Sequence, residues 1–219
     1  MDLRAWLERS GLVAVLRGVR PSEAESIGAA LVDAGVLIME VPLNSPDAYT
    51  SIERLHAQFG QRALVGAGTV MRPEEVLAVV RAGGRLIVSP HAAVDVTRAA
   101  RAAGVLSMPG FFTATEAFAL LDAGADALKL FPAEATTPAT LKALRAVLPP
   151  GTLVLPVGGI GSGALAQWVA VGASGFGTGS SLYKPGDGPE QVGERARALI
   201  AEYRRAVAEH RTPPRAAAS

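Results

Sequence analysis

The chain has 219 residues, 49% of them hydrophobic, and its 21 basic and 20 acidic side chains leave a formal net charge of +1. A near-neutral chain without a basic block is not expected to have nucleic acid or an anionic membrane as its main partner. The absence of cysteine and the scattered positions of His56, His91 and His210 exclude a disulfide scaffold, a thiolate nucleophile and a recognisable metal-ligand spacing.

The predicted elements follow one another in a regular order. Residues 2–10 have the pattern of a short amphipathic helix, with Leu3, Trp6 and Leu7 on one face. Eight short apolar runs typical of strands then alternate with helical patterns, and Pro21 and Gly35 mark the two ends of the first of these helices. The predicted strands cover residues 13–16, 37–42, 64–67, 86–89, 105–108, 127–131, 153–157 and 174–178, and a final helix covers 189–210.

This alternation predicts an α/β fold. The strands are apolar on both faces, as parallel strands covered by helices should be. Eight strand–helix units most simply close into a single (β/α)8 TIM barrel, here with an extra N-terminal helix, over residues 1–211. An open doubly wound sheet is disfavoured because no G-x-G-x-x-G motif follows the first strand. Residues 212–219 are polar and Pro-rich, and we expect them to be a disordered tail.

Two further features concern the location of the chain. No apolar run reaches the length of about 18 residues that a transmembrane helix needs. The first four residues include Asp2, and no long apolar segment follows, which is not the pattern of a signal peptide. We therefore expect a cytoplasmic protein.

A lysine stands at the centre of the sixth predicted strand. Lys129 is flanked by Leu128 and Leu130, whereas the other two lysines, Lys142 and Lys184, fall on a helix pattern and in a Pro/Gly-rich loop. A buried ammonium must be paired or lose its proton, and a neutral amine forms a Schiff base with a carbonyl substrate. On the strand alone, a structural ion pair and a nucleophile are both open interpretations.

The second predicted strand carries a carboxylate, Glu40. Because side chains alternate along a strand, Lys129 shares a face with Ala127 and Phe131, and Glu40 shares a face with Ile38. If both polar residues face the barrel axis, the carboxylate can transfer protons near the amine. A buried ion pair is less expected, because barrel interiors are normally filled with apolar side chains.

The last two strand ends are rich in glycine. Gly158 and Gly159 follow the seventh strand, and Gly179, Ser180 and Ser181 follow the eighth. Loops at these two places bind phosphate in many barrels, through backbone N–H groups and the amino end of a following helix. Ordinary turn glycines are the alternative interpretation.

Two more polar side chains follow strands. Arg17, after the first strand, suits a substrate carboxylate, with a salt bridge at the rim as the alternative. Thr69, after the third strand, suits a hydroxyl contact to the substrate, with a helix cap ahead of Pro73 as the alternative. The residues together indicate carbon–carbon cleavage beside a keto group, with the amine as electron sink, so no cofactor is expected. The rival functions are a phosphate-binding isomerase or epimerase and a catalytically inactive binding barrel.

The same residues resemble a known family, the class I aldolases of 2-keto-3-deoxy-6-phospho sugar acids (KDPG/KDPGal aldolases). The matching segments extend over nearly the whole chain up to about residue 185. They are Val15-Leu16-Arg17-Gly18, Glu40-Val41-Pro42-Leu43-Asn44-Ser45-Pro46, Gly66-Ala67-Gly68-Thr69-Val70, Leu128-Lys129-Leu130-Phe131-Pro132 and Val157-Gly158-Gly159-Ile160.

The resemblance implies a role for each candidate residue. Lys129 is implied as the Schiff-base lysine and Glu40 as the general acid/base, with Arg17 and Thr69 at the pyruvate end. The phosphate is implied at Gly158, Gly159, Gly179, Ser180 and Ser181. The implied substrate is a small phosphorylated keto acid, the implied products are pyruvate and glyceraldehyde 3-phosphate, and the implied assembly is a homotrimer.

Two positions bear on the branch of the family. Gluconate-type enzymes resemble this chain but usually carry Thr before the Gly-Gly pair and Arg shortly after the Glu-containing strand, where this chain has Val157 and Asn44. The substrates differ in one hydroxyl configuration, and Val157, a candidate substrate contact, has no hydroxyl to recognise it. The resemblance thus favours the galactonate branch, although the segment from Phe131 to Glu134 looks more like the gluconate branch. Gluconate or dual specificity is the alternative.

Overall fold

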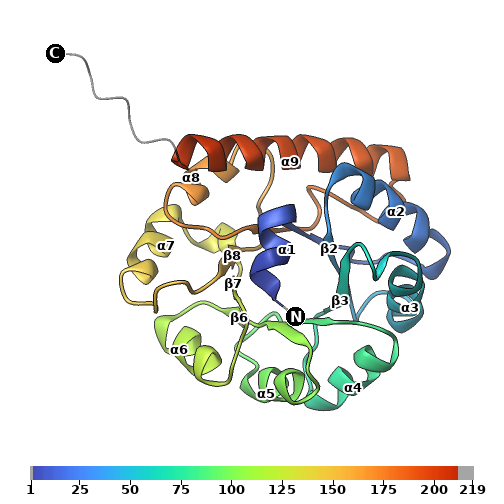
Figure 1. The fold of residues 1–219 in the computed structure, drawn as a ribbon, viewed down its shortest axis with the longest axis horizontal. Coiled ribbons are helices and arrows are strands. Elements are labelled where there is room, and N and C mark those ends of the chain that lie inside the picture. The colour runs from blue at the N-terminus through green and yellow to red at the C-terminus, as the bar shows by residue number, and fades with distance from the viewer. Residues whose placement is uncertain (1, 212–219) are drawn as a thin grey trace.

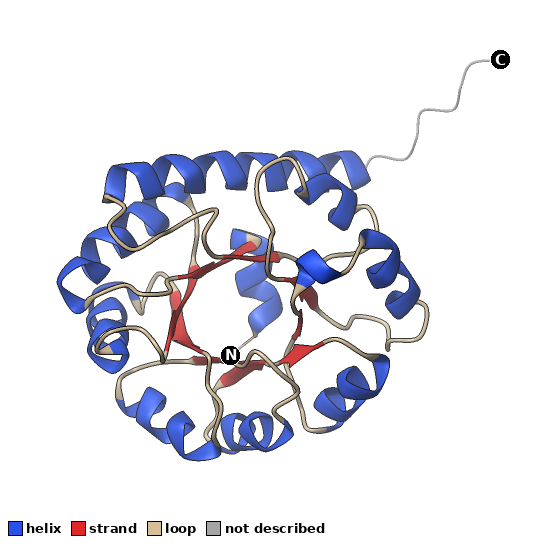
Figure 2. Cartoon of the chain, turned by 180° about the vertical axis from the view of Figure 1, so that it is seen from behind, coloured by secondary structure: helices blue, strands red, loops and turns tan. Residues whose placement is uncertain are grey.

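The computed structural model describes residues 2–211 as strands surrounded by helices (Figures 1 and 2). The strands are β1 (Leu12–Val15), β2 (Ile38–Pro42), β3 (Leu64–Gly68), β4 (Leu86–Val88), β5 (Leu106–Met108), β6 (Gly110–Phe111), β7 (Leu128–Leu130), β8 (Val154–Pro156) and β9 (Phe176–Thr178). The helices are α1 (Leu3–Ser10), α2 (Pro21–Ala34), α3 (Ala48–Phe59), α4 (Pro73–Arg81), α5 (Val94–Ala102), α6 (Ala114–Asp122), α7 (Pro138–Arg145), α8 (Leu165–Val169) and α9 (Pro189–Arg211), with a 3-10 turn η1 (Ala133–Ala135).

The strands form two parallel sheets that follow one another around the molecule. One has the order β5-β4-β3-β2-β1-β9 and the other β6-β7-β8. The chain passes from β5 to β6 through Pro109, and a parallel bridge between Val157 and Gly177 links β8 to β9. Figure 2 shows the strands as a ring inside the helices. The predicted α/β class with parallel strands is confirmed.

The strands separate two apolar cores. Leu128 and Leu130 of β7 belong to the larger core, between the strands and the surrounding helices. The inner core contains Ile38 of β2 and Leu155 of β8, and it also contains Leu3 and Leu7 of α1. Helix α1 therefore packs on the inside of the ring, where Figure 1 shows it in the centre of the view. This arrangement confirms the predicted face of the N-terminal helix.

Local sequence signals explain several element ends. Pro21 is the first residue of α2, and Gly35 ends this helix in the left-handed conformation with φ 93°. Thr113 and Glu116 form the predicted capping box at α6, where the Glu116 carboxylate accepts the Thr113 N–H at 2.8 Å. These caps fix the points at which helices give way to the loops of the candidate site.

The structure differs from the prediction in three places. The fifth strand, predicted over 105–108, continues as β6 after Pro109, which has no N–H and interrupts the ladder. The 3-10 turn η1 after β7 was not predicted, and α8 spans only Leu165–Val169. The tail predicted for 212–219 lies outside the described residues. In residues 2–211 no helix combines the length and apolar character needed to cross a membrane.

Candidate active site

Lys129 lies on the inner face of β7. Its neighbour Ala127 belongs to the inner core, and the Lys129 side chain is only 6% exposed. The Nζ atom lies 4.8 Å from the centre of the Phe131 ring. Burial lowers the pKa of the Lys129 amine, the negative charge of Glu40 opposes this shift, and the positive charge of Arg17 adds to it. The lowered pKa favours the uncharged amine that a Schiff base requires.

Glu40 lies on the inner face of β2 and is 1% exposed. Burial raises the pKa of the Glu40 carboxyl to about 7, against the opposing charges of Lys129 and Arg17. Its Oε2 atom has no hydrogen-bond partner within residues 2–211. The adjacent strand makes room for this group at Gly68, because a Cβ there would collide with the Glu40 carboxylate. A carboxyl with a pKa near 7 suits a general acid/base.

The two groups face each other across the ring. Strand β2 is separated from β7 by β3, β4 and the β5–β6 segment on one side, and by β1, β9 and β8 on the other. Each group shifts the pKa of the other, yet no salt bridge joins Lys129 to Glu40 in residues 2–211. The structure therefore does not support the alternative of a closed structural ion pair.

A pocket of about 380 Å³ opens beside Lys129. Predicted residues at its lining are Arg17, Lys129, Val157, Gly158, Gly159, Gly179, Ser180 and Ser181. Two predicted residues, Glu40 and Thr69, are not at this lining, and Glu40 lies in the buried interior. The pocket also includes Val15, Phe131, Glu134, Ile160, Gly161 and Lys184, which were not predicted as site residues.

The two glycine-rich loops meet at this pocket. Gly158 and Gly159 have φ values of 101° and 66°, a region that favours glycine. The Ser181 hydroxyl donates to the Ile160 carbonyl at 2.7 Å and so joins the two loops. No acceptor within the described chain takes the backbone N–H of Gly159 or Ser180. These donors are therefore available to an anion.

The expected help from helix amino ends is wrong for both loops. The segment after Ser181 is a turn, and α8 begins six residues after Gly159. The Glu202 carboxylate of α9 already accepts the N–H groups of Gly163 and Leu165 at the start of α8. Hydrogen bonds from these groups hold the pKa of Glu202 below its usual range although burial alone would raise it. Anion binding would thus rest on the loop backbone.

Arg17 lies at the exposed rim of the pocket, after β1. Its Nη1 donates to the side-chain carbonyl of Asn44 at 2.9 Å. No salt bridge within residues 2–211 involves Arg17, so the alternative of a rim salt bridge is wrong for the described chain. Asn44 orients the guanidinium without neutralising it, which leaves its charge available to a substrate carboxylate.

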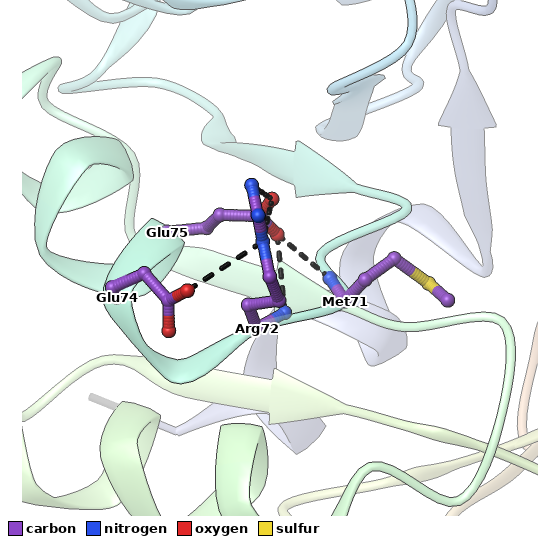
Figure 3. A network of polar contacts seen from close by, with 4 residues as sticks. All are labelled: Met71, Arg72, Glu74 and Glu75. Carbon is purple, nitrogen blue, oxygen red and sulfur yellow. Dashed lines mark hydrogen bonds and ion pairs between the residues drawn. The ribbon is translucent and has the colours of Figure 1, made fainter.

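Thr69 follows β3 with φ 56°, an unusual conformation for a β-branched residue. Arg72, and not Thr69, is the N-cap of α4, so the helix-cap alternative is wrong. Polar contacts on its C-terminal side hold this turn (Figure 3). Glu75 accepts the Met71 N–H at 2.8 Å and pairs with the Arg72 side chain at 2.9 Å, while Glu74 lies 3.6 Å from Arg72.

The aromatic residue of the pocket is Phe131, on the same strand face as Lys129. Alternation along β7 was a signal that could have identified it. The Phe111–Phe112 pair does not line the pocket, because Phe111 is buried in the helix-facing core and Phe112 is 45% exposed. In residues 2–211 no three His, Asp or Glu side chains gather as metal ligands would.

Comparison with known proteins agrees with this arrangement. The sequence profile of the KDPG and KHG aldolase family matches residues 3–188. The chain belongs to this family. It is 46% identical over 202 residues to the 2-dehydro-3-deoxy-6-phosphogalactonate aldolase of Escherichia coli K12, covering 92% of this chain and 98% of the relative.

Solved structures of this family have the same fold as the chain. A structure described as native KDPGal has a TM-score of 0.89 and 46% identity, and the match covers 90% of this chain and 96% of that one. The KDPG aldolase of Legionella pneumophila, with pyruvate captured as a covalent carbinolamine, has a TM-score of 0.81 and 27% identity, with 91% and 98% coverage.

Proposed function

We propose that the chain is a class I aldolase that cleaves 2-dehydro-3-deoxy-6-phosphogalactonate to pyruvate and glyceraldehyde 3-phosphate. The observation that carries this proposal is the buried Lys129 amine, whose pKa is lowered and which opens into the glycine-lined pocket. The 46% identity to the E. coli galactonate enzyme supports the substrate, and the carbinolamine of the Legionella relative supports covalent chemistry at a lysine.

The reaction begins at the keto carbon, C2. The neutral Lys129 amine adds to C2, and loss of water gives an iminium. Glu40 in its carboxylate form then takes the proton of the C4 hydroxyl, directly or through one water. The C3–C4 bond breaks, its electron pair moves toward the iminium nitrogen to form an enamine, and C4 leaves as the aldehyde of glyceraldehyde 3-phosphate.

The second half of the cycle returns the proton and frees the lysine. Glu40 gives its proton to C3, which becomes the methyl group of pyruvate and restores the iminium. Water hydrolyses the iminium to pyruvate and the free Lys129 amine. A carboxyl whose pKa is about 7 can accept and donate this proton near neutral pH.

The ends of the substrate are held by different parts of the pocket. The Arg17 guanidinium, oriented by Asn44, binds the C1 carboxylate, and the Thr69 hydroxyl assists at the same end. The 6-phosphate lies against Gly158, Gly159, Gly179, Ser180 and Ser181. The free N–H groups of Gly159 and Ser180 support this orientation. The pyruvate end is thereby directed toward Lys129.

Trapping with pyruvate and borohydride tests the proposal. Reduction of the iminium should give a stable mass increase that peptide mapping localises to Lys129. Lys142, an exposed lysine on α7, is the internal control and should remain unlabelled. An isomerase, an epimerase or an inactive binding barrel would give no such label and no exchange of pyruvate methyl protons with solvent deuterium.

The gluconate-configured epimer is the second candidate substrate. The segment Phe131-Pro132-Ala133-Glu134 resembles the gluconate branch, and the Legionella relative is a KDPG aldolase. Val157 lies at the pocket wall and has no hydroxyl to recognise the C4 configuration. Cleavage of the two C4 epimers side by side decides between galactonate, gluconate and dual specificity.

We further infer that residues 1–211 form one closed (β/α)8 barrel with α1 as its extra N-terminal helix. The Val157–Gly177 bridge and the short β5–β6 connection support closure. The homotrimer is proposed on the family resemblance alone, and light scattering of the purified protein would test it. The cytoplasmic location and the absence of a cofactor stay predictions.

A further inference from the structure

Lys184 is a pocket cation that the reaction above does not use. It lines the pocket from the loop after β9, together with Gly159, Ser180 and Ser181. The other two cationic side chains of the pocket, Arg17 and Lys129, serve the keto-acid end of the proposed substrate. The Lys184 side chain is exposed, and no salt bridge in residues 2–211 involves it.

The backbone at Lys184 is held in place on both sides. The Lys184 N–H donates to the Asp187 carboxylate at 2.8 Å, and Arg195 binds the same carboxylate at 2.5 Å. The preceding Tyr183 is 3% exposed, and its hydroxyl donates to Glu23 of α2 at 2.7 Å. These contacts position the Lys184 backbone at the pocket. They also commit Asp187 to Arg195, whose hydrogen bond is the main cause of the lowered pKa of Asp187.

We propose that Lys184 is a substrate-binding residue that recognises the phosphate group and so favours phosphorylated over unphosphorylated keto acids. This inference rests on the proposed aldolase function and adds a charge to its phosphate site. Backbone N–H groups hydrogen-bond phosphate oxygens but carry only partial charges, whereas a lysine ammonium adds a full positive charge. The five glycine and serine residues of the two loops contribute no full positive charge, so discrimination by charge falls to Lys184.

Glu134 places an opposite charge at the same pocket. It belongs to η1, is exposed, and lies so close to Gly159 that a Cβ there would be 2.7 Å from its Oε2. A carboxylate at this distance from the phosphate loop repels a dianion. Lys184 and Glu134 therefore predict effects of opposite sign on the same substrate group, which a general change in folding cannot imitate.

The experiment compares each phosphorylated substrate with its unphosphorylated counterpart. For wild type, K184M, K184R and E134Q, the ratio of the two kcat/KM values is measured at low and at high salt. K184M should lower this ratio about three- to tenfold at low salt, the range of a partly exposed charged contact, mainly through KM. K184R should restore most of the ratio, E134Q should raise it, and salt should reduce all of these differences.

K142M is the matched control, because it removes an exposed lysine from α7, away from the pocket. Its ratio should equal that of wild type. An unchanged ratio in K184M, or an equal loss with both substrates, would overturn the role of Lys184. Borohydride trapping with pyruvate is run on the same samples, so that failure of the aldolase function is recognised separately from failure of this inference.

Discussion

The two ends of the inner face of the strands have opposite character. Toward the amino end, Ile38 of β2 and the residue Ala127 before β7 pack with α1 in an apolar core. Two residues further along the same strand faces stand Glu40 and Lys129, both buried and both with shifted pKa values. One face thus supports stability at one end and chemistry at the other, and a distance of two residues separates the two roles.

Removal of the amine should have the largest effect. Lys129→Met should lower kcat/KM by at least about 10⁴-fold, as expected when a nucleophile is lost. The free energy of unfolding at pH 7 should not fall, because a buried amine is replaced by an apolar side chain. Steady-state kinetics and urea unfolding measure the two quantities. Unfolding of the variant would mean that Lys129 is needed for the fold.

A substitution at the opposite end should reverse this result. Leu7 of α1 is 2% exposed in the inner core, and Leu7→Ala should reduce the free energy of unfolding by about 2–5 kcal/mol. The variant should still form the borohydride-trapped adduct with pyruvate at temperatures where it is folded. Leu77→Ala, at an exposed position of α4, is the control and should have little effect on unfolding. Loss of trapping in folded Leu7→Ala protein would contradict a separation of the two ends.

The ionisation of Glu40 should make stability depend on pH. Its pKa is about 7 in the folded chain against 4.5 as the ordinary value, so the unfolded chain ionises first as pH rises. Below pH 4.5 both states are protonated, and between pH 4.5 and 7 the carboxyl increasingly disfavours folding. Glu40→Gln should therefore gain stability relative to wild type across this window, by about 3 kcal/mol from the size of the shift.

Unfolding experiments at pH 4.5 and pH 8 measure this difference. Glu134→Gln, which removes an exposed carboxylate from the pocket rim, should show no comparable change between the two pH values. An equal effect of Glu40→Gln at both pH values would mean that the Glu40 carboxyl is not held protonated by burial.

The smallest predicted effect concerns specificity. Val157 is 5% exposed at the pocket wall, and Val157→Thr adds a hydroxyl at nearly constant size. One new hydrogen bond should shift the ratio of kcat/KM values for the two C4 epimers toward the gluconate form by about three- to tenfold. Val15→Thr, at another pocket position, is the control. No shift in Val157→Thr would place the discrimination elsewhere.

Much of this site could be predicted from periodicity along single strands. Alternation placed Lys129 and Glu40 on the inner face, and the glycine runs marked Gly158 and Gly179 before any coordinates were available. Contacts between distant segments could not be predicted in this way. Nothing near Leu165 indicates that Glu202 occupies the amino end of α8, and nothing near Lys184 indicates that its loop lines the pocket.

Backbone strain was equally hidden. The sequence around Thr69 suits a helix cap, and only the structure gives this threonine its positive φ, with Glu75 holding the next residue. A short-range signal describes which conformations a residue prefers, whereas a functional turn is imposed by the surrounding structure.

Gly68 gives the acid of the site an unusual dependence on its neighbour. The carboxyl of Glu40 occupies the volume that a methyl group at position 68 would need. Evolution at these two positions is therefore coupled: any larger residue on β3 would force the acid to a new rotamer or a new strand. The geometry of proton transfer in this protein is thus written partly in an atom that residue 68 does not have.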